Sequence, residues 1–182
     1  MNQLSEQLRR LLSDVNDWLR FAESKNAVII GLNGAAIFGL LSTFPRMFVR
    51  TGLVRKLAIW SITMLSLSAV VSLLSFLPRL ELTQTHKSSR KGTSVNLLYF
   101  GSIATLEPDD LISGLSAINE LRTKAPSKLD WQYAQQIVNN SRIAVTKYRL
   151  FTLAVWVDLL GIAPPIAVIA FLVTTIGRRR SR

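Results

Sequence analysis

The sequence predicts an all-α protein: a small helical membrane protein that carries a helical module outside the bilayer. The main observation is an uncharged run of 21 residues over 57–77, bounded by Arg55–Lys56 and Pro78–Arg79. At about 1.5 Å per residue, a helix of this length crosses a hydrocarbon core of roughly 30 Å. Two further apolar runs cover 27–44 and 151–176. The chain has 22 Lys and Arg residues and only 11 Asp and Glu residues. The basic residues mostly flank these apolar runs, which favours membrane anchoring over nucleic-acid binding.

The composition argues against most catalytic and metal chemistry. There is no cysteine, so disulfides, thiolate metal sites and a cysteine nucleophile are excluded. His86 is the only histidine, which leaves histidine metal sites and Ser–His–Asp catalysis poorly supplied. We expect no enzyme activity, no metal and no cofactor.

Residues 1–26 are predicted to form an amphipathic helix. Its apolar residues recur at helical spacing and are Leu4, Leu8, Leu11, Leu12, Val15, Trp18, Leu19 and Ala22. The mixed charges ahead of the first apolar run argue against a cleaved signal. Either this helix packs on the protein's own polar region or it lies on the lipid surface, and its four acidic residues favour the first.

The segment 27–77 is predicted to be a transmembrane hairpin with spans 27–44 and 57–77. In the first span Gly31, Ala35 and Gly39 are four residues apart, a spacing that lets another helix approach closely. Asn33 needs a hydrogen-bond partner in lipid, and a neighbouring helix is a more ordinary partner than a conducted ion.

The second span carries four serines on one helical face: Ser61, Ser68, Ser72 and Ser75. Small hydroxyl residues at this spacing usually pack against another helix. A water-lined seam in an oligomer is the alternative. The spans are joined by the connector 45–56, which contains four basic residues.

Residues 78–150 are predicted to form a helical module. A glycine-containing polar loop, 81–94, holds His86, Lys87, Arg90 and Lys91, which suit either an anion or lipid headgroups. A helix is expected from Pro108 to about Lys124, because a proline followed by acidic residues is typical of a helix start. Another begins at Leu129 and continues into the last span.

The last span, 151–176, contains the only acidic residue of the apolar runs, Asp158. Intramembrane carboxylates are often functional, but Asp158 is also close enough to the end of the run to be solvated at the membrane boundary. Pro164 and Pro165 remove backbone donors, so they should kink the helix and leave the carbonyls near Leu160 and Gly161 unpaired. This kink is either a gating hinge or a simple bend. A basic tail, 177–182, follows.

Charge favours a cytoplasmic N-terminus and a cytoplasmic module at 78–150. With three spans in this orientation, 14 basic residues lie inside and 8 outside, in agreement with the positive-inside rule.

Four segments together resemble the transmembrane effectors of Pycsar, the pyrimidine cyclase system for antiphage resistance. They are AESKNAVIIGLNGA (22–35), LPRL (77–80), NLLYFGSIA (96–104) and QQIVNNSRIAVTKYRL (135–150). The most specific pieces are YFG at 99–101 after Asn96, and Lys147–Tyr148. Ser102 departs from the pattern, because a histidine or a more polar residue is expected there.

The resemblance implies an antiphage effector in the bacterial inner membrane. A partner cyclase encoded nearby would supply cyclic CMP or cyclic UMP as the activating ligand, and the effector would then impair the membrane and stop the infected cell. Within the module, Asn96, Tyr99, Arg142 and Lys147 offer an amide, a ring and two cations for such a ligand. Gly31, Ala35, Gly39, Asp158, Pro164 and Pro165 are the candidates for packing and gating.

Other functions fit the same spans. The chain can equally be a ligand-independent scaffold whose module binds a protein, or a holin-like pore; a membrane-bound enzyme has the least support. Self-association is expected, because three helices of this size enclose no pore alone.

Overall fold

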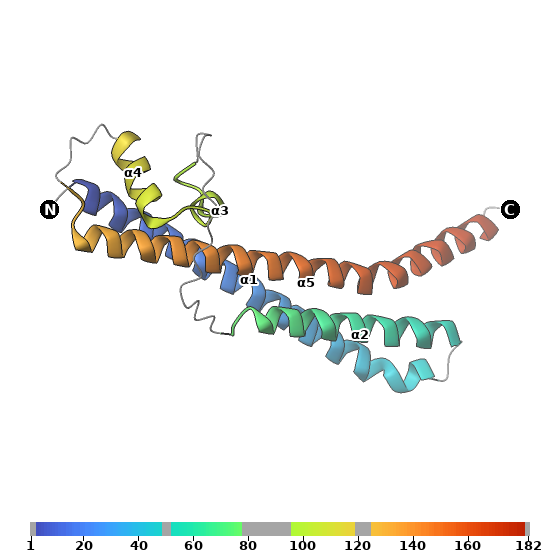
Figure 1. Ribbon diagram of the computed structural model, residues 1–182. Helices are drawn as coiled ribbons and strands as arrows, with labels where there is room; N and C mark the ends of the chain where they lie inside the picture. The colour runs from blue at the N-terminus through green and yellow to red at the C-terminus, as the bar shows by residue number, and fades with distance from the viewer. Residues whose placement is uncertain (1–2, 49–51, 78–95, 119–124, 181–182) are drawn as a thin grey trace. The chain divides into compact units, whose positions relative to one another are not determined.

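The computed structural model describes residues 3–48, 52–77, 96–118 and 125–180, which contain five α-helices and no strand. The helices are α1 (Gln3–Phe48), α2 (Gly52–Leu74), α3 (Phe100–Ile103), α4 (Pro108–Ile118) and α5 (Lys128–Arg180) (Figure 1). The chain divides into two compact units. We call residues 1–24 and 77–149 the polar unit, and residues 25–76 and 150–182 the membrane unit. The predicted all-α fold is confirmed.

Three helices, α1, α2 and α5, are long and apolar enough to cross a membrane. The helix bounds differ from the predicted spans: α2 ends at Leu74 instead of Leu77, and α5 continues beyond 176 to Arg180. The helix α1 continues through Pro45 to Phe48 and α2 already begins at Gly52, so most of the expected connector 45–56 is helical. A proline so close to the end of a helix removes a single backbone donor, which the helix can lose without stopping.

The core of the polar unit is built by α1, α3, α4 and α5, together with Leu97 from the segment before α3. The N-terminal turns of α1 present a leucine and valine face to α4 and to the first turns of α5. The core residues are Leu4, Leu8, Leu11, Val15, Leu97, Ile103, Leu111, Ile112, Leu115, Ala134, Ile137 and Val138. Each large aliphatic side chain buried here contributes about 1.5–3 kcal/mol. The amphipathic helix therefore packs on the protein's own polar region, as expected.

A capping box fixes the start of α5. The Ser127 hydroxyl accepts a hydrogen bond from the Asp130 N–H (3.2 Å), and the Asp130 carboxylate accepts one from the Ser127 N–H (2.9 Å). These reciprocal bonds satisfy donors that a helix start leaves without partners. Ser5 of α1 donates to the other oxygen of the same carboxylate. Asp130 thus ties the start of α1 to the start of α5.

The predicted ends of two helices can be compared with the structure. α4 begins at Pro108 as expected and is described to Ile118, while its expected end near Lys124 lies outside the described residues. α5 begins at Lys128 and continues without interruption to Arg180. The loop 81–94 with its basic residues also lies outside the described ranges.

In the membrane unit α2 packs between α1 and α5 through hydrogen bonds. Asn33 Nδ2 of α1 donates to Ser68 Oγ (3.0 Å), and Ser68 Oγ donates to the Ala154 carbonyl of α5 (3.0 Å). Asn33 therefore has its partner on a neighbouring helix, as predicted. The four serines that were expected to share one face, including Ser68, are all buried.

Candidate functional site

Asn96 and Tyr99, two of the predicted ligand residues, form the entry to α3. Asn96 is exposed, and its Oδ1 accepts a hydrogen bond from the Leu98 N–H (2.9 Å), which stabilises a turn. Tyr99 precedes the first residue of α3 and is 51% exposed. Its ring lies against Gly101, where an added Cβ would meet the Tyr99 Cζ at 2.8 Å. Only glycine at position 101 permits this placement of the Tyr99 ring.

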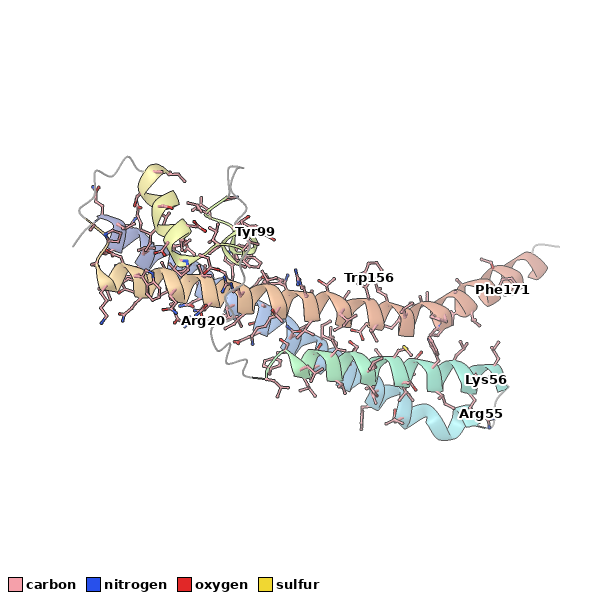
Figure 2. The ribbon with its side chains drawn as sticks, in the orientation of Figure 1. Arg20, Arg55, Lys56, Tyr99, Trp156 and Phe171 are labelled. Carbon is pink, nitrogen blue, oxygen red and sulfur yellow. The ribbon has the colours of Figure 1, made fainter. Side chains whose placement is uncertain are left out.

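Four aromatic residues form a cluster with Phe100 at its centre. We define the aromatic cluster as Trp18, Tyr99, Phe100 and Tyr148. The buried Phe100 ring lies 5.2 Å from Tyr148 in a stacked arrangement. It lies 4.9 Å from Tyr99 and 5.5 Å from Trp18, both tilted. The cluster joins α1, α3 and α5, and two of its rings, Tyr99 and the 44% exposed Trp18, present surface to solvent. Figure 2 labels Tyr99 beside α3.

The cluster includes Trp18, whose contact with Phe100 was not predicted from the sequence. Helical spacing assigned Trp18 to the apolar face of α1, and no local signal pairs it with a ring some eighty positions away. Within the cluster, burial raises the pKa of Tyr148, and the neighbouring Tyr99 raises it further. The Tyr148 phenol therefore stays neutral throughout the physiological range.

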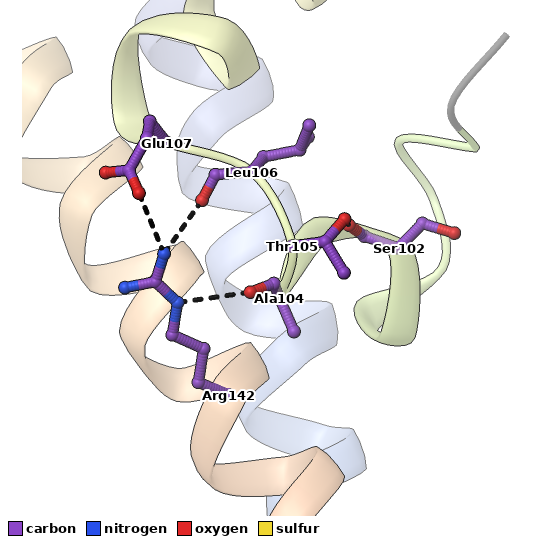
Figure 3. Close-up of polar contacts among 6 residues, drawn as sticks. All are labelled: Ser102, Ala104, Thr105, Leu106, Glu107 and Arg142. Atoms are coloured by element: carbon purple, nitrogen blue, oxygen red, sulfur yellow. Dashed lines mark hydrogen bonds and ion pairs between the residues drawn. The ribbon is translucent and has the colours of Figure 1, made fainter. Parts of the chain in front are cut away.

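Arg142 holds the segment between α3 and α4. Its Nε donates to the Ala104 carbonyl (3.1 Å) and its Nη2 donates to the Leu106 carbonyl (3.0 Å) (Figure 3). Nη2 also pairs with the Glu107 carboxylate at 3.3 Å. These charge-assisted bonds hold the segment on α5. None of them uses Nη1, so Arg142 retains donors for an anion.

Lys147 forms an ion pair with Glu23 of α1. The Lys147 Nζ lies 2.9 Å from Glu23 Oε1, and the lysine side chain is only 13% exposed. An anionic ligand at Lys147 would therefore compete with a carboxylate of the same protein. Release of Glu23 would in turn remove a tie between α1 and α5.

The structure does not bring all four predicted ligand residues to one point. Five residues of α-helix separate Arg142 from Lys147, which places them about 140° apart around the axis of α5. Their partners also differ: Arg142 donates to the segment between α3 and α4, and Lys147 pairs with Glu23 of α1. Tyr99 joins Tyr148, the neighbour of Lys147, through Phe100. The aromatic cluster with Lys147 is therefore the more coherent part of the candidate site.

The predicted small-residue face of α1 is exposed. Gly31, Ala35 and Gly39 are exposed, and a Cβ added at either glycine would meet no atom within 4 Å. The buried side of α1 in this unit carries Asn26 and Asn33 instead. By helical geometry the glycine face lies on the opposite side of α1.

Two side chains of α2 donate hydrogen bonds to the carbonyls of α5 that the proline pair leaves unpaired. A proline lacks the N–H that would bond the carbonyl four residues earlier, so Pro164 and Pro165 leave the carbonyls of Leu160 and Gly161 free. Trp60 Nε1 donates to the Leu160 carbonyl (3.0 Å), and Ser61 Oγ donates to the Gly161 carbonyl (2.8 Å). We call these two bonds the clasp.

Close helix contact accompanies the clasp. A Cβ added at Gly161 would meet the Met64 Cβ at 2.8 Å, so only glycine lets the two backbones approach this closely here. Beyond Gly161, no side chain of α5 whose placement is described is buried. The tight packing of α5 on α2 therefore stops at the clasp, and Figure 1 shows α5 bending away from α2 beyond this point.

Asp158 lies inside the membrane unit. It is 9% exposed, and its Oδ1 has no hydrogen-bond donor among the described residues. The protein rather than bulk water surrounds this carboxyl group. In the described part of the chain, no group of three or more His, Cys, Asp or Glu side chains is placed to hold a metal ion.

The arrangement combines two features. The polar unit has half-exposed aromatic rings and a part-buried Lys147–Glu23 ion pair, and the membrane unit has a polar interior and a proline pair within α5. No curated protein and no solved structure matches this chain. A family model, described as the Pycsar effector protein domain, matches residues 7–174, which is nearly the whole chain. The chain belongs to this family of Pycsar effector proteins.

Proposed function

We propose that this chain is an antiphage effector of the bacterial inner membrane, activated by cyclic CMP or cyclic UMP from a partner cyclase. Membership of the Pycsar effector family implies antiphage defence by a transmembrane effector. Three helices that are able to cross a membrane support action within the bilayer. On this proposal the chain acts without catalysis or cofactor: ligand binding favours a membrane-damaging arrangement that stops the infected cell. The positive-inside rule favours a cytoplasmic polar unit, where such a ligand would be found.

The continuity of α5 is the observation that carries the proposal. One uninterrupted helix contains Lys147 and Tyr148 of the candidate ligand site, and then Asp158 and the proline pair of the last span. A ligand that shifts the first part of this helix therefore acts on the same helix whose backbone hydrogen bonds are interrupted at the proline pair. The shift requires that the ligand bind the two arrangements with different affinity.

The chemistry of the polar unit suits a cyclic pyrimidine nucleotide. A pyrimidine base can stack on a half-exposed ring, and Tyr99 and Trp18 both offer one. The single negative charge of a cyclic phosphodiester can pair with a lysine, and Lys147 is the cation next to the aromatic cluster. On this proposal the phosphodiester displaces Glu23 from Lys147, and the tie between α1 and α5 is lost.

The proposal is tested by dye entry into cells that express the chain with and without a cytidylate or uridylate cyclase. We expect permeabilisation with one cyclic nucleotide, and its loss in Lys147→Ala. Arg149→Ala is the matched control, because Arg149 is an exposed cation of the same helix. Isothermal titration of the purified variants should show that Lys147→Ala weakens nucleotide binding at least tenfold, the effect of losing about 1.4 kcal/mol.

Two outcomes would contradict this function. Permeabilisation that does not depend on any cyclic nucleotide would indicate a holin-like pore. An intact membrane under every condition, with normal insertion of the protein, would indicate a scaffold.

A further inference from the structure

The interior of the membrane unit is mainly polar. Among the described residues, seven polar side chains of this unit are buried, against three hydrophobic ones. The polar set is Asn26, Asn33, Ser61, Ser68, Ser72, Ser75 and Asp158; the hydrophobic set is Ala58, Leu65 and Ala154. Large apolar side chains such as Trp156 and Phe171 are exposed instead (Figure 2). Apolar groups thus cover the outside, where lipid would lie, and hydroxyl, amide and carboxyl groups fill the inside.

The hydrogen bonds between helices fix where Asp158 lies in this interior. Ser61 bonds the Gly161 carbonyl and Ser68 bonds the Ala154 carbonyl, so α2 and α5 are antiparallel. Asp158 follows Ala154 by four residues and precedes Gly161 by three, a spacing that keeps all three on one face of α5. The carboxyl group therefore lies between the two hydrogen-bonded levels.

The buried polar groups form a column along α2. On α2 they recur at Ser61, Ser68 and Ser72, and Ser75 follows in the turn after the helix. Asp158 lies near the level of the intervening Leu65. Ser72 follows Ser61 by eleven positions, which corresponds to about 16 Å of helix. This is about half of a hydrocarbon core of roughly 30 Å. We call this set the polar column.

Packing accounts for some members of the column and not for others. Asn33, Ser61 and Ser68 donate hydrogen bonds to neighbouring helices. The Asp158 Oδ1 and the Ser72 Oγ are fully enclosed and have no hydrogen-bond partner among the described residues. A buried polar oxygen without a partner costs free energy, so a retained one suggests a ligand.

The single acidic residue of the polar column indicates the charge of the ligand that the column can bind. Asp158 is the only acidic residue of the membrane unit in the sequence. The described basic residues of α2, Arg55 and Lys56, are exposed at its start (Figure 2). One carboxylate among neutral oxygens suits a monovalent cation, because divalent cations such as Ca²⁺ usually recruit several charged oxygen ligands.

We propose that Asp158 binds a monovalent metal cation, and that the polar column is a cation path when α5 separates from α2. The binding site stands on the structure alone. The conducting role rests on the proposed function, because it requires an arrangement that opens the membrane. Damage to the bilayer would then begin as a cation-selective leak through the protein.

The binding site is tested on the purified full chain by thermal unfolding in NaCl or KCl, against N-methylglucamine chloride at the same pH and ionic strength. A bound Na⁺ or K⁺ should raise the Tm by about 2–4 °C, because it binds only the folded chain. Asp158→Asn should lose the difference and Asp158→Glu should retain part of it. Ser66→Ala, on the exposed side of α2, should leave the difference unchanged.

The path is tested by the reversal potential of the nucleotide-activated chain in planar bilayers under a KCl gradient. We expect a potential close to that of K⁺, and one near zero in Asp158→Asn. An unselective or anion-selective leak would overturn the path, and an equal Tm difference in wild type and Asp158→Asn, including no difference in either, would overturn the binding site. A cation-dependent Tm without any leak would instead count against the proposed function, since the binding measurement needs no opening.

Discussion

Asp130 is a residue whose role follows from its local chemistry. Burial alone would raise the pKa of its carboxyl group, but hydrogen bonds from Ser5 and Ser127 outweigh this and lower it below the ordinary value of 3.8. A carboxylate with a lowered pKa in the folded state stabilises that state above its ordinary pKa. The stabilisation is lost as the pH falls through the lower, folded-state value.

We therefore predict that Asp130→Ala destabilises the polar unit by about 1–3 kcal/mol at neutral pH, the range for hydrogen bonds to a buried charged group. The variant should approach the wild type in stability as the pH falls below 3.8. Thermal unfolding followed by circular dichroism over this range measures both effects. Asp14→Ala, an exposed position of α1, is the control; equal losses in both variants would contradict the role given to Asp130.

The candidate ligand residues show how far single residues can be predicted. The sequence suggests these residues by type, and the structure shows that Tyr99 presents a half-exposed ring. Their role in binding a ligand stays a prediction. Their partners were not predicted, because the Ala104 carbonyl that Arg142 bonds and the Glu23 carboxylate that Lys147 pairs with are distant in the sequence. Hydropathy and spacing report local geometry, whereas these pairs depend on how the helices pack.

At the scale of elements, the loss of two backbone hydrogen bonds at the proline pair of α5 is the feature that the sequence predicts most completely. The two prolines identify by position which carbonyls lose their donors. What the sequence does not show is that consecutive residues of α2, Trp60 and Ser61, supply replacements. The clasp gives hydrogen-bond partners to the two carbonyls that the prolines leave unpaired.

This pairing can be tested by a double-mutant cycle. Ser61→Ala removes the donor to the Gly161 carbonyl, and we expect a loss of about 1–2 kcal/mol in the stability of the purified chain. Pro165→Ala restores the backbone N–H for the same carbonyl. In the Pro165→Ala background, Ser61→Ala should therefore cost much less, because the carbonyl then has a helical partner. Additive effects of the two changes would show that Ser61 and Pro165 do not share the Gly161 carbonyl.

The same cycle bears on gating. If α5 bends at the proline pair when the membrane is opened, Ser61→Ala should raise dye entry in the absence of nucleotide. The double variant Pro164→Ala, Pro165→Ala should lower nucleotide-dependent dye entry. Unchanged nucleotide binding and toxicity in the double proline variant would show that the proline pair only bends α5 and has no role in gating.

At the scale of the whole molecule, three helices do not enclose a pore, so a leak requires either opened helices or several copies. The polar column faces inward and the glycine face of α1 faces outward, on opposite sides of that helix. In the part of the chain that the structure describes, a Cβ added at Gly31 or Gly39 would meet no atom within 4 Å, so neither glycine is needed there for a close helix contact. Small residues at intervals of four lower the closest distance between two helices, which makes this face suitable for the same helix of a second copy.

We predict that Gly31→Leu combined with Gly39→Leu reduces self-association and nucleotide-dependent dye entry together. Within one chain the added side chains meet no atom within 4 Å of the Cβ, so folding and nucleotide binding should persist. Cross-linking in membranes, with the mass of the purified complex, measures association; titration of the nucleotide checks that the polar unit is intact. Ala36→Leu adds the same bulk at an exposed position away from the glycine face and should change neither. Full association in the glycine variant would mean that copies meet through another surface, whereas lost association with undiminished dye entry would mean that one chain opens the membrane alone.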